Sequence, residues 1–249
     1  MRKVAALVLA LGVVTAFHAG AEALPVGQGG FVLIDGQAFD VPYEEQGKRV
    51  WAGSADDPLV FVHPDGNGRL SLWAAGNKDP ALAYVLTATD AGAPSVFGLF
   101  FVIPMVPPVG APNGAAAAIR GRLTDAAGDG VSIVPSFGSV QVSNLGAPDT
   151  NLGVDVGGPA AFGPGLPGAS YDYGPFGAGP VPGPGPGPWE SLATGVVFTL
   201  SGGDDVGSLA GSVGFGRVPV PGPAAALLVG CGLLGIGVAA RRRPFGRRS

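Results

Sequence analysis

The chain has 249 residues, of which 45 are glycine and 25 are proline, and its formal net charge is −4 at pH 7. No strict Gly-X-Y period runs through it, which excludes a collagen helix. The single cysteine, Cys231, excludes a disulfide framework and a cysteine metal site elsewhere in the chain. Seventeen acidic and seven basic residues lie between Leu24 and Pro221, and so acidic a surface argues against nucleic acid as a partner.

The N-terminus has the pattern of an export signal. Two basic residues precede an apolar run of 13 residues (4–16), and Ala21 and Ala23 then occupy the small-x-small positions that signal peptidase cleaves. An apolar run of this length is too short to span a bilayer comfortably, which argues against an N-terminal membrane helix. We therefore expect residues 1–23 to be a signal peptide, with the mature chain beginning at Leu24.

Short apolar segments separated by turn residues make up most of the mature chain. Pairs such as Asp35-Gly36 and Asp129-Gly130 favour positive φ and tight reversals. Strand-length segments at regular spacing, without a sustained 3.6-residue apolar stripe, predict an all-β fold: an antiparallel β-sandwich or jelly roll. The expected strands are Phe31–Ile34, Arg49–Gly53, Leu59–His63, Arg69–Ala74, Ala81–Thr89, Val96–Ile103, Ala115–Leu123, Val131–Val134, Val140–Ser143, Gly195–Leu200 and Leu209–Phe215.

Some of these segments carry more detailed predictions. Val96–Ile103 is nearly all apolar, which is typical of a central strand covered on both faces. It should leave the sheet at Pro104, since proline cannot donate to the ladder. The alanine run Ala115–Ala118 is the one place where a short helix could interrupt the sheet. Trp51 and Trp73 could stack on sugar rings, but because they lie within expected strands the core is the favoured place for them.

Residues 146–188 are dominated by glycine and proline. Such a composition cannot bury enough apolar surface to offset its ordering entropy unless it packs on something else. We therefore expect a long loop laid across the sandwich and pinned by its aromatic residues, with 24–217 forming one domain. Trp189, Tyr171 and Tyr173 are the candidates in this loop for an exposed surface on which sugar rings could stack.

Catalytic side chains are few in the mature region. His63 is its only histidine, and no Gly-x-Ser-x-Gly elbow occurs. Glutamates are scarce, so a hydrolase would have to rely on Glu190 or His63. We predict that the protein is not an enzyme and needs no cofactor.

Calcium is a minor hypothesis for the acidic turns. Asp65 and Asn67 place oxygen ligands at alternate positions of the turn Asp-Gly-Asn-Gly, as calcium loops do. The pairs Asp125/Asp129 and Asp204/Asp205 are further candidates. Plain turns are the alternative for all of them.

The C-terminal segment, 218–249, has three parts in a fixed order. Prolines in the motif Val218-Pro219-Val220-Pro221 block a helix and keep the chain extended and accessible. An uncharged run of 17 residues (224–240) follows, at the short end of what crosses a bilayer as a helix. The basic tail 241–249 begins with Arg241, Arg242 and Arg243, which stay on the cytoplasmic side and stop transfer.

An extended motif, an apolar anchor and a basic stop together resemble the PEP-CTERM sorting signal of Gram-negative bacteria, which exosortases recognise. Val220 stands where the family's glutamate lies, so the motif is similar to the VPxP variant. The resemblance implies transient residence in the inner membrane and processing near Val218–Pro221 by an exosortase-like enzyme. It also implies release or attachment at the cell surface, in the company of exopolysaccharide and biofilm. An anchor that is never cut is the alternative.

These patterns lead to one main hypothesis and two alternatives. The main hypothesis is an exported cell-surface or extracellular-matrix structural protein without catalytic activity, associated with exopolysaccharide. The first alternative is a carbohydrate-binding surface module that uses the loop aromatics. The second is a secreted hydrolase.

Overall fold

The computed structural model describes residues 29–146, 150–185 and 187–218, and these ranges contain β-strands and no helix. No segment within them is therefore a helix that could cross a membrane. The expected signal peptide, including Ala21 and Ala23, lies outside the described residues. So do the expected helix 224–240, the three arginines after it, and the whole sorting motif except Val218.

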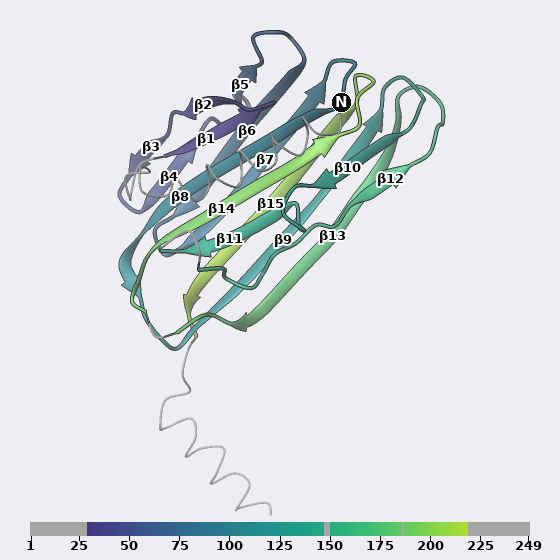
Figure 1. Ribbon diagram of the computed structural model, residues 1–249. Coiled ribbons are helices and arrows are strands. Elements are labelled where there is room, and N and C mark those ends of the chain that lie inside the picture. Colours follow the sequence, from purple (N-terminus) through teal and green to yellow (C-terminus); the bar gives the residue numbers. More distant parts are fainter. Residues whose placement is uncertain (1–28, 147–149, 186, 219–249) are drawn as a thin grey trace, which may run out of the picture. The chain divides into compact units, whose positions relative to one another are not determined.

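The strands form two antiparallel sheets, labelled in Figure 1. Sheet A contains β1 (Gly30–Ile34), β2 (Gln37–Val41), β8 (Ser95–Val109), β10 (Val131–Pro135), β11 (Gln141–Leu145), β12 (Ala160–Phe162) and β14 (Trp189–Leu200). Sheet B contains β3 (Glu44–Gln46), β4 (Arg49–Ala52), β5 (Leu59–Val62), β6 (Gly68–Asn77), β7 (Ala81–Asp90), β9 (Asn113–Asp125), β13 (Ala169–Pro182) and β15 (Val206–Arg217).

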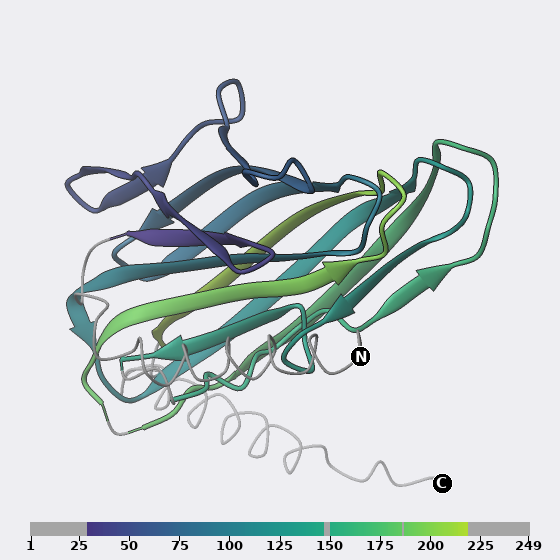
Figure 2. The same ribbon diagram turned by 45° about the horizontal axis from the view of Figure 1, so that its top comes forward.

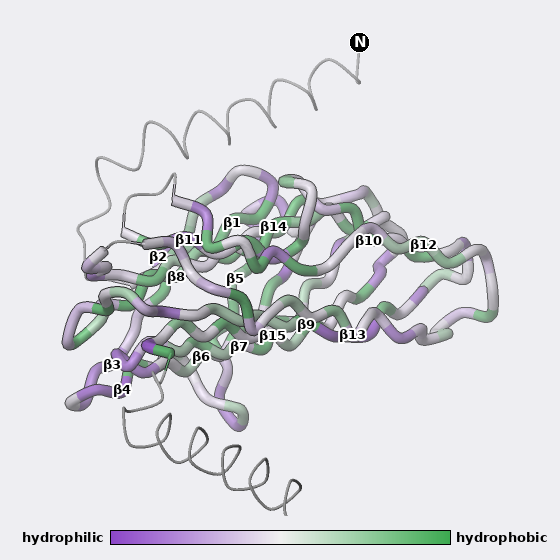
Figure 3. Tube along the Cα trace, turned by 90° about the horizontal axis from the view of Figure 1, so that it is seen from below, coloured by the Kyte–Doolittle hydropathy of each residue, from purple (hydrophilic) through white to green (hydrophobic). Residues whose placement is uncertain are grey.

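The strand order is β12-β10-β14-β8-β1-β2 in sheet A, with β11 also paired to β14. In sheet B the order is β13-β9-β15-β7-β6-β4-β3, with β5 also paired to β6. Figure 3 shows the sheets as two layers, and Figure 2 shows that their long strands run in nearly the same direction. The fold is thus an aligned, all-β antiparallel sandwich, as the sequence predicts.

The core lies between the sheets because apolar side chains alternate along the strands. In β7, Leu82, Tyr84 and Leu86 are buried while the residues between them are at least partly exposed. A single cluster of buried side chains joins both sheets. The prediction that β8 is covered on both faces is confirmed: Leu99 and Phe101 face the core, and Phe100 on the other side is only 6% exposed. Phe100 is stacked on Phe31 there.

One buried polar bridge crosses the core. Tyr84 of β7 donates its hydroxyl hydrogen to Gln141 Oε1 of β11 at 2.6 Å, and Gln141 Nε2 donates to the Ser212 carbonyl of β15 at 3.0 Å. Burial raises the pKa of the Tyr84 hydroxyl well above its usual value, with a smaller contribution from Tyr173. The Tyr84 hydroxyl therefore stays protonated and keeps donating to the opposite sheet.

The prediction of a long loop over 146–188 is wrong for much of its length. Strand β13 occupies 169–182 and pairs with β9 from one end to the other. Its register shifts at the two Gly-Pro steps, Gly174-Pro175 and Gly179-Pro180, where the glycines have φ of +86° and +89°. An edge strand tolerates proline at such irregularities because one of its sides has no neighbouring strand, so a missing N–H donor there breaks no ladder hydrogen bond. The strands that follow, β14 and β15, return to the two sheets as expected.

Two further predictions also need correction. Strand β8 does not end at Pro104 but continues to Val109, and Pro104 lies opposite Ser191 in β14. Met105 and Val109 still face the core, so burial holds this proline-containing stretch in the sheet. The alanine run Ala115–Ala118 lies within β9, where its alternate residues are buried, and it forms no helix.

Candidate functional site

The expected glycan-stacking residues, Tyr171, Tyr173 and Trp189, make contacts within the protein itself. Tyr173 is 1% exposed and donates to the Gly158 carbonyl at 2.8 Å, so its ring cannot receive a sugar, and the prediction is wrong for this residue. Burial raises its pKa above the usual value. Tyr171 stacks on Phe162 with ring centroids 4.5 Å apart. Trp189 is partly buried against the core, and its indole N–H donates to the Pro184 carbonyl at 2.9 Å.

Trp51 and Trp73 face outward, which corrects the prediction that they fill the core. Each is partly exposed and lies between buried neighbours: Val50 and Ala52 for Trp51, and Leu72 and Ala74 for Trp73. Neither belongs to the core cluster nor to the partly buried residues packed against it. Both therefore lie on the outer face of sheet B, the side turned away from sheet A. The period-two pattern of β6 was the available signal, because inward leucines at 70 and 72 place residue 73 outside.

A shallow groove of about 800 Å³ crosses this outer face. One row of directly opposite residues follows it across six strands: Trp51, Ala75, Ala83, Ser212, Ala118 and Gly177. Residues directly opposite in an antiparallel pair lie on the same face of the sheet. The groove thus has a floor of alanine, glycine and serine and an indole ring at one end. We call it the sheet B groove.

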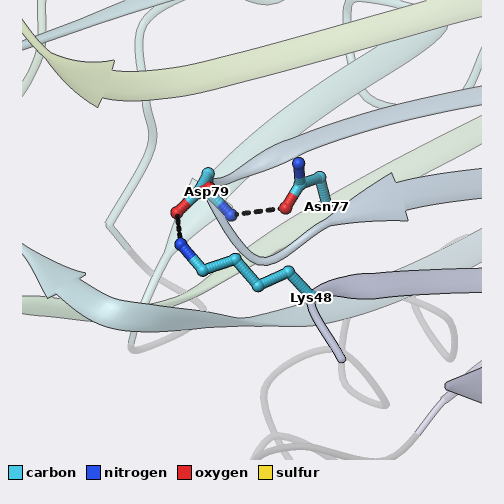
Figure 4. Close-up of polar contacts among 3 residues, drawn as sticks. All are labelled: Lys48, Asn77 and Asp79. Carbon is cyan, nitrogen blue, oxygen red and sulfur yellow. Dashed lines mark hydrogen bonds and ion pairs between the residues drawn. The ribbon is translucent and has the colours of Figure 1, made fainter. Parts of the chain in front are cut away.

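Two ion pairs fix the turns beside Arg49 and Asn77, which also line the groove. Lys48 Nζ lies 2.6 Å from Asp79 Oδ1, and the Asp79 backbone N–H donates to Asn77 Oδ1 at 3.0 Å (Figure 4). Lys78 pairs with Glu45 in the same region. These contacts join the β3–β4 turn to the β6–β7 turn, so both turns hold this end of the groove in place.

A smaller hollow of about 280 Å³ lies farther along the same face, lined by Arg120, Arg122, Asp172 and Ser208 among others. Arg122 Nη2 lies 3.7 Å from Asp172 Oδ1, and both side chains are mostly exposed. The Ser208 hydroxyl is 3.2 Å from that of Thr87, which lies directly opposite it in the adjacent strand β7. The outer face of sheet B therefore changes from small and apolar to polar and cationic along the same strands, β7, β9, β13 and β15.

Aspartates gather at one end of the sandwich. Asp125, Asp129 and Asp205 place their carboxylates within 4.8 Å of one another, so the structure unites residues that the sequence predicted as two separate pairs. Asp125 accepts the N–H groups of Gly128 and Gly130. These bonds provide a structural role for the cluster, because they close the loop after β9.

Asp90 and Asp205 connect this end of the two sheets. Asp90 accepts the N–H groups of Gly202 and of Asp205, and Asp205 accepts the Ala126 N–H and the Ser201 hydroxyl. Burial raises the pKa of Asp90 to about 6, and the neighbouring Asp205 and Asp204 carboxylates add to the rise. Burial also raises the pKa of Asp205, aided by the charges of Asp125 and Asp129.

The turn at Asp65 and Asn67, the candidate of the minor calcium hypothesis, is closed by internal hydrogen bonds. The Asp65 N–H donates to His63 Nδ1 at 3.2 Å, and the Gly66 N–H donates to the His63 carbonyl at 2.8 Å. Asp65 does not belong to the one group of three metal-ligating side chains found among the described residues.

His63 lies in this turn of sheet B while Glu190 lies in β14 of sheet A, so the two residues named for a hydrolase belong to different sheets. Val218 follows β15 and is 46% exposed.

No family model matches the sequence, and no curated protein matches it either. Among solved structures, the C-terminal CBM6 of LamC, a marine laminarinase from Zobellia galactanivorans, is similar over 63% of this chain and 87% of that chain. The identity is 13% and the TM-score is 0.18. A likeness this low carries no argument about fold or function, so the sandwich rests on its own strand order and register.

Proposed function

We propose that this protein is an exported, non-catalytic β-sandwich that binds a polysaccharide across the outer face of sheet B. The observation that supports this most directly is the sheet B groove with Trp51 at its end. Binding sites for small molecules and sugars are concave and mostly apolar, with a few polar groups that fix orientation. An outward indole beside a floor of small side chains offers a sugar ring both a stacking partner and room to approach.

The floor of the groove favours a chain-like ligand over a compact one. Six strands contribute to its central row, and neighbouring strands lie about 4.8 Å apart, so the row is about 24 Å long. The groove is open to solvent along this length rather than closed into a pocket. A polymer can therefore enter from the side and extend beyond both ends.

The groove is tested by measuring polysaccharide binding of the intact secreted chain, for example by affinity electrophoresis in gels that contain defined polysaccharides. Trp51→Ala should weaken binding at least about tenfold, which corresponds to about 1.4 kcal/mol. Ala83→Trp should abolish binding because it fills an exposed position in the middle of the floor. Neither side chain packs in the core, so both variants should fold.

Trp189→Ala tests the alternative in which Trp189, Tyr171 and Tyr173 bind the carbohydrate. Trp189 is partly buried on the other sheet, and its loss should lower stability without a selective loss of binding. Selective loss of binding in Trp189→Ala, with Trp51→Ala unaffected, would place the site at Trp189, at the start of β14 in sheet A, instead. A folded wild-type protein that binds no polysaccharide would leave only the structural role.

Export and sorting are part of the proposal and are supported by residues outside the described ranges. The signal peptide pattern ending at Ala23 and the PEP-CTERM-like segment 218–249 support passage through the inner membrane and processing by an exosortase-like enzyme. Intact masses of the protein from cell-surface and medium fractions test both ends together. We expect a chain that starts at Leu24 and lacks 224–249; a surface form that retains 224–249 would contradict the sorting proposal.

A further inference from the structure

Arginines collect on the outer face of sheet B although the protein is acidic. Between Leu24 and Pro221 there are seven basic and seventeen acidic residues. Four of the seven basic residues are exposed arginines that alternate with buried neighbours on sheet B strands and therefore face outward. These four are Arg49 in β4, Arg69 in β6, and Arg120 and Arg122 in β9.

The strands of sheet B place few negative charges on the same face. Glu44 lies directly opposite Trp51, and Asp172 lies directly opposite Arg122. Four arginines and two carboxylates give this face a local charge of +2, while residues 24–221 carry −10 in total. An anionic ligand approaching the protein is therefore repelled by most of its surface and attracted to this face.

The arginines are not used up by internal ion pairs, in contrast to the lysines. Lys48 and Lys78 are paired with Asp79 and Glu45. In the part of the chain that the structure describes, Arg49, Arg69 and Arg120 have no carboxylate oxygen within 4.0 Å. The pair between Arg122 and Asp172 is long and exposed, and such pairs contribute little to stability.

Arg49 lines the sheet B groove, Arg120 lies two residues from the floor residue Ala118 in β9, and Arg69 lies six residues from Ala75 in β6. Arg49 and Arg120 lie on β4 and β9, four strand steps or about 19 Å apart across the sheet. The register places Arg49 in the row of Ala116, four residues or about 14 Å along β9 from Arg120, so the two positions are about 24 Å apart. Arg120 and Arg122 are two residues apart on one strand, which is about 7 Å. Guanidinium groups bind carboxylate and sulfate groups through two parallel hydrogen bonds. Cations spaced in this way match a polymer that carries repeated negative charges better than a single small anion.

We infer that the ligand of the sheet B groove is an anionic polysaccharide, whose sugar rings contact Trp51 and whose carboxylate or sulfate groups bind the outward arginines. This inference rests on the proposed function, because it assigns the chemical class of ligand to the same groove. The arginines would set the preference for charged chains, and the groove with Trp51 would supply contacts that a neutral chain could also make. Binding should therefore weaken as salt is raised, since exposed charge pairs are screened.

The test uses the secreted chain with polygalacturonate as a carboxylate polymer, dextran sulfate as a sulfate polymer and dextran as a neutral one. We expect tighter binding to at least one of the charged polymers than to dextran, and a loss of this preference in high salt. Which charged polymer binds more tightly distinguishes carboxylate from sulfate recognition. Arg120→Gln should weaken binding to that polymer about fivefold or more, whereas Arg217→Gln removes the same charge at the end of β15 and should change it less than twofold.

Three results would overturn the inference. Equal binding of dextran and the charged polymers, with no effect of Arg120→Gln, would refute the anionic ligand but leave the proposed groove intact. Single-stranded DNA bound as tightly as the charged polysaccharides would indicate an unspecific polyanion surface. Failure to bind any of the polymers, with the fold shown intact by its unfolding transition, would refute the proposed function itself.

Discussion

Gly211 is the position where a single methyl group should damage the fold most directly. It lies on the core side of β15 between Leu209 and Val213, below the bridge between the sheets. A Cβ added to it would lie 2.1 Å from the Tyr84 hydroxyl oxygen and 2.6 Å from Gln141 Oε1. Its φ is in the range that other residues adopt, so the cost of Gly211→Ala is steric.

The magnitude follows from these distances. To regain an ordinary contact of about 3.5 Å, the Tyr84 ring must retreat by about 1.4 Å. That movement breaks its 2.6 Å hydrogen bond to Gln141. Overpacking of a core costs about 1–3 kcal/mol, and a buried acceptor left unpaired costs about 1–3 kcal/mol more. We expect Gly211→Ala to lower the free energy of unfolding by about 2–6 kcal/mol, a large part of the 5–15 kcal/mol typical of a domain.

Gly214 offers a matched control three residues along the same strand. It faces outward, and nothing lies within 4 Å of a Cβ added there. Gly214→Ala should change stability by less than about 1 kcal/mol, and in the stabilising direction. Urea unfolding followed by tryptophan fluorescence measures both variants. If Gly211→Ala came within about 1 kcal/mol of Gly214→Ala, the Tyr84–Gln141 bridge would not be the rigid contact described above.

Two further predictions concern pH and the groove floor. Because the pKa of Asp90 is raised from its usual 3.8 to about 6, the folded protein holds this proton more tightly than the unfolded chain does. The protonated Asp90 carboxyl therefore contributes to the free energy of unfolding below about pH 4. This contribution, at most about 3 kcal/mol, is lost as the pH rises to about 6. Urea midpoints measured from pH 4 to pH 7 should show wild type losing stability relative to Asp90→Asn, and a gain instead would contradict the prediction. Ala83→Thr should stabilise the exposed centre of β7, since threonine suits a strand better than alanine, while weakening polysaccharide binding by raising the floor. Equal or tighter binding in this variant would count against the groove.

The sequence was sufficient for the strands with clear alternation or strong apolar character. β1, β4, β5, β7 and β10 lie where apolar residues and flanking turns predict them. The same signal fails for β13, because its sequence is mostly glycine, proline and small residues and it buries few side chains of its own. Its place in the sheet depends on pairing with β9, a long-range contact that no local pattern records.

The site was harder to predict than the fold because it depends on which way side chains point. As large apolar residues, Trp51 and Trp73 are expected in the core, although the pattern of leucines in β6 places Trp73 on the opposite face. The aspartates of the cluster were visible as two separate pairs, Asp125/Asp129 and Asp204/Asp205. Only the folded chain brings Asp205 to Asp125 and Asp129, since these segments are about 80 residues apart in sequence.

The outer face of sheet B is difficult to explain by stability alone. Alanine and glycine are poor strand residues, yet they occupy the centre of this sheet at Ala75, Ala83, Ala118 and Gly214. Valine or threonine there would pack against neighbouring strands and would also keep solvent from the backbone. Small side chains instead leave the backbone uncovered and form the shallow groove between Trp51 and the arginines of β9. Residues of low strand propensity therefore form a groove beside arginines that have no carboxylate partner or only an exposed one. Ligand binding explains this combination better than the requirements of folding do.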